Sequence, residues 1–155
     1  AAGLVAEILQ RPYDPAELVA AAVKMRDEIA RHKPPSGPLD VKLGEGGLVD
    51  LEFSVHVLQL ARKSGLEPRL EQAVEQLASD GFIDASIVST QHLLTQMLVT
   101  IRLVAPETTS PSEESCELMA RACGSGSWNE LLARHDEARH SVSKLWNRVK
   151  GGDLG

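Results

Sequence analysis

The most constraining feature of the sequence is a long amphipathic pattern near its C-terminal end. Residues 127–130, Ser-Trp-Asn-Glu, form a capping box, in which a serine hydroxyl and a glutamate carboxylate bond the first free amides of a helix. Residues suited to a core then recur at alternating spacings of four and three: Leu131, His135, Ala138, Val142, Leu145 and Val149. A helix with one such face must pack on other elements. The pattern therefore predicts helices packed around this one.

Composition agrees with a helical domain. Hydrophobic residues make up 43% of the 155 residues and aromatic residues only 3%, so the core must consist of Leu, Val, Ile and Ala. Such a core favours helices packed on helices, and the chain length is typical of one domain. The predicted fold class is all-α.

Charge and targeting signals exclude several classes of function. The formal net charge is -6, the wrong sign for general attraction to phosphate backbones, so nucleic acid is not an expected partner. We find neither an apolar run of about 18 residues nor a secretory signal, so we expect no membrane partner and a cytoplasmic location. Because the sequence begins with Ala1, we also expect a piece of a longer protein.

The first predicted helix spans 15–32. Residues 14–17, Asp-Pro-Ala-Glu, place an N-cap, a first-turn proline and an acid in order. The apolar positions of this helix are Leu18, Ala22, Met25 and Ile29. An earlier apolar set, which predicts the end of another helix, comprises Leu4, Val5, Ile8 and Leu9.

Further helix signals lie between residues 70 and 126. An apolar stripe over 70–78 ends at Asp80-Gly81, and Asp84 is positioned to cap a long helix that Pro106 stops. A second capping box at 110–113, Ser-Pro-Ser-Glu, opens a shorter helix before the Gly-Ser-Gly of 124–126.

Isolated histidine, tryptophan and cysteine side chains are predicted to be structural. We expect a packed, hydrogen-bonded core position for His135 and core-anchoring roles for Trp128 and Trp146. Cys116 and Cys123 are about 10.5 Å apart along a helix, too far for a disulfide, and are expected to act as small hydrophobes.

The segment 48–58 fits two kinds of secondary structure. Leu48, Leu51, Val55 and Leu58 make a helical stripe, yet apolar and polar residues also alternate, which slightly favours a strand. A strand would direct Asp50 and Glu52 from one face as a magnesium-binding pair, whereas a helix would separate them by about 200°.

The helical alternative would place a glycine loop, 44–47, at a helix N-terminus. Free amides there hold phosphate or carboxylate groups, and Lys42 would add charge. The spacing matches neither GxGxxG nor GxxxxGK, so the pattern alone is a weak phosphate signal. The competing interpretation is a capped turn in which first-turn acids only stabilise the helix.

Residues 40–53, DVKLGEGGLVDLEF, resemble the pattern D-[LIV]-K-x-x-x-G-G-[LI]-x-D-[LI]-E-F of the bifunctional glutamine synthetase adenylyltransferase/deadenylylase family. The flanking stretches 11–15, 25–26 and 37–40 are similar as well. The resemblance extends from about residue 4 to residue 149 and favours the helix for 48–58.

The resemblance implies the helical domain that follows the nucleotidyltransferase domain in the C-terminal, adenylylating half of that enzyme. Residues 1–39 would be linking helices, 40–150 an up-and-down helical bundle and 151–155 a tail, with a short helix and the glycine-rich loop before the bundle. Expected partners are the preceding nucleotidyltransferase domain, glutamine synthetase and a PII signal protein. The residues implied at a nucleotide or domain interface are Lys42, Gly44, Gly46, Gly47, Asp50 and Glu52.

In this family the adenylylating half transfers AMP from ATP, with Mg²⁺, to a tyrosine of glutamine synthetase, and the other half removes it, which regulates nitrogen assimilation. The nucleotidyltransferase signature, Gly-Ser followed by an acid-x-acid pair, is absent here: Gly126-Ser127 precedes Asp136-Glu137, but Ala138 follows. We therefore expect no catalytic or metal-binding residue, no bound cofactor and no transfer by this chain alone. Two alternatives are the helical domain of a PII uridylyltransferase and a docking module without a nucleotide role.

Overall fold

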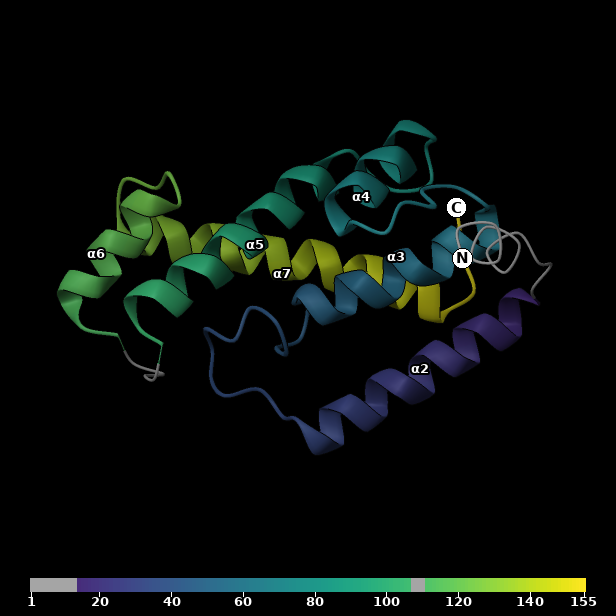
Figure 1. Ribbon diagram of the computed structural model, residues 1–155, viewed down its shortest axis with the longest axis horizontal. Helices are drawn as coiled ribbons and strands as arrows, with labels where there is room; N and C mark the ends of the chain where they lie inside the picture. Colours follow the sequence, from purple (N-terminus) through teal and green to yellow (C-terminus); the bar gives the residue numbers. More distant parts are fainter. Residues whose placement is uncertain (1–13, 107–110) are drawn as a thin grey trace.

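The computed structural model describes residues 14–106 and 111–155, which form a bundle of helices (Figure 1). The elements are α2 (Pro15–His32), α3 (Leu48–Arg62), α4 (Leu70–Ser79), α5 (Ser86–Val104), α6 (Glu113–Ala122) and α7 (Trp128–Lys150). No strand occurs within these two ranges, which confirms the all-α prediction. The apolar set predicted over residues 4–9 lies outside the described residues.

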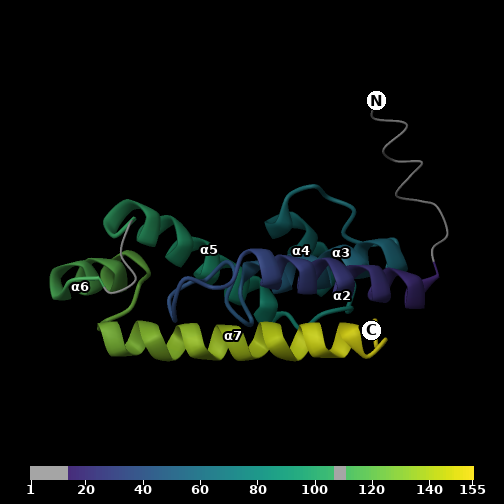
Figure 2. The same ribbon diagram turned by 90° about the horizontal axis from the view of Figure 1, so that it is seen from below.

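The long helix α7 forms one side of the molecule, and the other helices lie on it (Figure 2). It packs against α2, α3, α5 and α6, whereas α4 packs on α3 and α5. Ser127 Oγ accepts the Glu130 amide at 3.1 Å, as the capping box predicts. The Glu130 carboxylate bonds the Gly126 amide, one residue before the expected position. All six predicted core positions of α7 are buried.

Helix α3 passes between its neighbours and is buried on most of its surface. Because α2, α4, α5 and α7 all pack on it, apolar residues occur on nearly every face of the helix. This arrangement explains why alternation along 48–58 favoured a strand, an interpretation that is wrong. The core around α3 includes Leu51, Val55 and Leu58, each with no exposed surface.

Side chains that precede the helices bond early amides of α2, α5 and α6. Asp14 is the N-cap of α2, as predicted, and its Oδ1 accepts the Ala16 amide at 3.0 Å. Asp84 Oδ1 accepts the Ser86 amide at 2.8 Å, but the N-cap of α5 is Ala85, one residue after the predicted cap. The N-cap of α6 is Ser112, whose Oγ accepts the Ser115 amide at 3.2 Å. Helix α6 therefore begins at Glu113, two residues later than a box opened at residue 110 would give.

The buried face of α2 differs from the predicted one. Val19, Ala22 and Arg26 are buried, while Met25, which the apolar pattern placed on the packed face, is 56% exposed. The helix is thus rotated toward a position occupied by an arginine. The spacing of apolar residues could not identify this face, because one of its buried members is charged.

The aromatic predictions hold, whereas the cysteines, predicted to be small buried hydrophobes, differ: Cys123 is buried and Cys116 is half-buried. Trp146 is buried and its ring centroid lies 6.2 Å from that of Phe53, and half-buried Trp128 packs against the core. Both cysteines are free, and burial raises the pKa of the Cys123 thiol.

The C-terminal residues also contact the bundle, since Leu154 is buried and its carbonyl accepts a hydrogen bond from the Arg62 Nε at 2.9 Å. Among the described residues, no helix has the length and apolar character needed to cross a membrane.

Candidate functional site at the glycine loop

Asp40 organises the loop that leads into α3. Its Oδ1 accepts the amides of Leu43 and Lys42 at 2.9 and 3.2 Å, and its Oδ2 accepts the Ser36 amide at 3.0 Å. Partial burial acts to raise the pKa of this carboxyl, but the amide bonds outweigh it and hold the pKa below its usual value. Asp40 is therefore a charged anchor of the loop backbone.

The loop backbone also bonds the start of α3. The Leu48 amide donates to the Val41 carbonyl at 2.8 Å and the Val49 amide to the Lys42 carbonyl at 3.0 Å. These are amides that a phosphate at the helix N-terminus would use. In this conformation the loop itself occupies them, as the interpretation of a capped turn predicts.

Each glycine of the loop lies where a side chain would collide. A Cβ on Gly44 would lie 2.6 Å from the Asp40 carbonyl oxygen, and one on Gly47 equally close to the Val41 carbonyl oxygen. Gly46 has a φ of 74°, and its Cβ would overlap the carbonyl oxygen of Arg139 on α7. The glycines thus allow the loop to fold on itself and to contact the backbone of α7.

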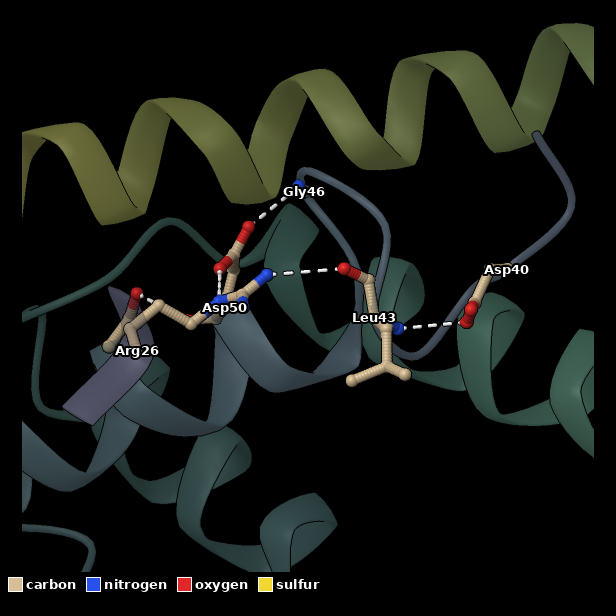
Figure 3. Close-up of polar contacts among 6 residues, drawn as sticks. Arg26, Asp40, Leu43, Gly46 and Asp50 are labelled. Atoms are coloured by element: carbon tan, nitrogen blue, oxygen red, sulfur yellow. Dashed lines mark hydrogen bonds and ion pairs between the residues drawn. The ribbon is translucent and has the colours of Figure 1, made fainter. Parts of the chain in front are cut away.

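A buried ion pair fixes the loop to α2 (Figure 3). The Arg26 Nε donates to Asp50 Oδ1, and Asp50 Oδ2 accepts the Gly46 amide at 2.8 Å. A second nitrogen of Arg26, Nη2, donates to the Leu43 carbonyl at 3.2 Å. Arg26 is 8% exposed and Asp50 4% exposed, so water screens this network little. Asp50 therefore connects the loop, α3 and α2.

Of the six predicted site residues, the structure brings Gly46 and Asp50 into this network. Gly44 and Gly47 shape the same loop through close backbone contacts, and the side chains of Lys42 and Glu52 lie outside the network. Lys42 is exposed and Glu52 is half-buried. Within the described ranges, neither side chain forms a hydrogen bond or an ion pair. On a helix, the carboxylates of Asp50 and Glu52 also diverge by about 200° and do not face one another.

Arg26 is the residue of this network that the sequence pattern did not identify as part of the site. It lies at spacings of seven and four from Val19 and Ala22, so it follows the buried face of α2. An arginine in register with a buried face is a signal for a buried ion partner. The sequence pattern did not identify Arg139 for another reason. This residue lies against Gly46 through its backbone carbonyl, and a backbone contact leaves no side-chain pattern in the sequence.

His135 on α7 is buried, as predicted, but it does not form the predicted hydrogen bond. It is 3% exposed, and its Nε2 has no hydrogen-bond partner among the described residues. Burial, helped by the charge of Arg139 and opposed by Asp136, lowers its pKa to about 4. His135 is therefore a neutral core residue at neutral pH.

Comparison with known proteins identifies relatives of the whole segment. The family model for the GlnD PII-uridylyltransferase matches residues 20–149. Curated relatives include proteins of Caulobacter vibrioides (37% identical over 57% of this chain), Rhodopseudomonas palustris strain BisB5 (29% over 97%) and Rhizobium meliloti (30% over 98%). Each is named a bifunctional glutamine synthetase adenylyltransferase/adenylyl-removing enzyme.

The chain spans only 9–16% of the length of these relatives. No solved structure matches it significantly. The matched region of the family model includes most of α2, the glycine loop, all of α3 to α6 and α7 up to its penultimate residue. The chain therefore belongs to the GlnD PII-uridylyltransferase family.

Proposed function

We propose that the chain is the helical domain of a glutamine synthetase adenylyltransferase, an enzyme that transfers AMP from ATP to a tyrosine of glutamine synthetase. The observation that carries the proposal is the extent of the matches: proteins of that name match 97–98% of this chain, while the chain accounts for 16% of them. A segment of this kind is one domain of a larger enzyme.

Within that enzyme, the glycine loop is the part we assign to the interface with the nucleotidyltransferase domain. Backbone bonds and the Arg26–Asp50 pair hold the loop in one shape, which leaves the exposed Lys42 side chain available to a nucleotide phosphate or to a carboxylate of that domain. Gly44, Gly46, Gly47 and Asp50 set the loop shape, and Glu52 lies just beyond it.

Catalysis itself belongs to another part of the enzyme in this proposal. The chain carries no Gly-Ser with a following acid-x-acid pair, so ATP and Mg²⁺ would bind on the neighbouring domain. The whole enzyme would act in the cytoplasm, with glutamine synthetase as its substrate and a PII protein as its regulator. Residues 1–39 would link the two domains, 40–150 would form the bundle and 151–155 its tail.

The test is Lys42→Ala in the full-length enzyme, with Lys24→Ala, an exposed lysine on α2, as the matched control. We expect kcat/KM for AMP transfer to fall about tenfold, in line with the loss of one charge-assisted hydrogen bond. The control should leave the rate unchanged. AMP transfer is measured by the mass increase of glutamine synthetase. Unchanged transfer with weaker partner binding would instead identify a docking module without a nucleotide role.

A second candidate, the helical domain of a PII uridylyltransferase, is favoured by the description of the matching family model. The two candidates differ in nucleotide and in protein substrate. The full-length enzyme should modify glutamine synthetase with ATP and leave PII unmodified with UTP. Modification of PII by UTP would reverse the assignment.

Titrating the isolated chain into glutamine synthetase, and separately into PII, by calorimetry tests which contacts the bundle makes. Heat with either protein would assign docking to this domain. No heat with either would assign recognition to the catalytic domain or to a surface shared by both domains, and the bundle would then support the loop alone.

A further inference from the structure

Helices α4 and α5 bring three metal-ligating side chains together away from the glycine loop. Glu71 and Glu75 lie one turn apart on α4, and His92 lies on α5. One ligand atom from each residue lies within 4.8 Å of the other two. All three side chains are exposed, so an ion can reach them from solvent.

We propose that Glu71, Glu75 and His92 bind one divalent transition-metal ion, with Zn²⁺ as the best-matched probe. Zinc is bound in proteins by imidazole nitrogen and carboxylate oxygen, and three protein ligands leave the fourth position for water. Magnesium and calcium prefer sets of oxygen ligands only. The imidazole therefore favours a transition metal over the Mg²⁺ proposed for AMP transfer.

The separation of His92 from Glu71 fits a tetrahedral ion. Zinc bonds of about 2.0–2.1 Å at tetrahedral angles place the ligand atoms about 3.3–3.4 Å apart. His92 Nε2 and Glu71 Oε1 are 3.2 Å apart, close to that value. Glu75 has a flexible, exposed side chain on the same face of α4 as Glu71, so a rotation can bring its oxygen closer.

The position of the ligands also explains what the ion would do. Glu71 and Glu75 are like charges at a spacing of four on one helix, an arrangement that is unfavourable until a cation neutralises it. Because one ligand comes from α5 and two from α4, the ion would join these two packed helices. An ion that binds the folded chain and not the unfolded chain would then raise the thermal stability of the fold.

Calorimetric titration with ZnCl₂ tests the site on the 155-residue chain. We expect saturable binding of one zinc per chain and no comparable heat with MgCl₂. His92→Ala and Glu75→Gln should each weaken zinc binding by at least about tenfold, since even residues that only support a ligand contribute that much. His32→Ala, an exposed histidine at the end of α2, is the matched control and should bind as the unchanged chain does.

Two further measurements keep the result independent of folding. Circular dichroism should show the same helical content in all variants, because the substituted side chains are exposed. Zinc should raise the thermal midpoint of the unchanged chain and of His32→Ala, but not that of His92→Ala. Absence of saturable binding, binding that survives His92→Ala, or one zinc bound between two chains would each overturn the proposal.

Discussion

The start of α3 and the length of α7 reach stability by different means. At α3, loop carbonyls bond the first amides, glycines touch backbone, and one buried ion pair joins three segments. Along α7, a capping box starts the helix and a stripe of side chains packs on its neighbours. The structure at α3 therefore depends on a few individual atoms, whereas that of α7 depends on a repeated pattern.

The comparison is tested most strongly by removing the buried charge at α3. Asp50→Asn should lower the free energy of unfolding by about 3–5 kcal/mol, because it leaves the Arg26 guanidinium buried without its counter-ion. Asp136→Asn is the matched change on α7; it removes an exposed, solvent-screened pair with Arg139 and should leave the free energy of unfolding nearly unchanged. Urea unfolding followed by circular dichroism measures both.

A double variant distinguishes the cost of leaving the Arg26 charge unpaired from the cost of changing the side chain at position 50. Arg26→Met combined with Asp50→Asn removes the uncompensated charge and should be more stable than Asp50→Asn alone. A cost below about 1 kcal/mol for Asp50→Asn would show that the pair contributes no more than a surface pair, and the contrast with α7 would fail.

The second prediction concerns the contact between the loop and the α7 backbone. Gly46→Ala should lower the free energy of unfolding by about 3 kcal/mol, because the new Cβ overlaps the Arg139 carbonyl and φ is positive. Gly81→Ala is the matched control, with a φ of 81° and no atom within 4 Å of the added Cβ; it should cost about 1 kcal/mol. Equal costs for the two would mean that only the dihedral angle matters.

Helices that have one solvent-exposed face and local caps were predicted well from the sequence. The bounds of α2 and the cap and buried stripe of α7 were predicted from capping residues and spacing alone. Periodicity did not identify α3, because a helix buried on most sides shows little contrast between its faces. The resemblance of residues 40–53 predicted that helix, and with it the glycine-loop residues.

Contacts made across the fold were not predictable in the same way. Spacing on α2 placed Met25 inside, and the register of Arg26 becomes a signal only once the packed face is known, because the counter-ion Asp50 lies 24 residues away. The position of Gly46 against α7 depends on how two distant segments pack. No local pattern encodes that packing.

The smallest expected effect belongs to α7 and depends on pH. The pKa of His135 is about 4 in the folded chain and near 6.5 in the unfolded chain, so between these values the unfolded state binds more protons. The stability due to neutral His135 is complete above about pH 6.5 and is lost as pH falls toward about 4, by an amount on the order of 2 kcal/mol.

Urea unfolding at about pH 7 and about pH 5 measures this loss. His135→Met should remove the part of the pH dependence due to this residue, while His140→Met, at an exposed position on the same helix, should leave it in place. An unchanged pH dependence in His135→Met would contradict a neutral histidine in the core.

The contact of Gly46 with the middle of α7 has a mechanical consequence. A helix of 23 residues is a stiff rod, and its first turns pack with α6 while its middle touches the loop. With no free space between Gly46 and the Arg139 carbonyl, α7 cannot slide toward the loop without moving it. A force or ligand that displaced the α6 end of the rod would thus reach the loop, and by thermodynamic reciprocity a clamped loop would resist that displacement.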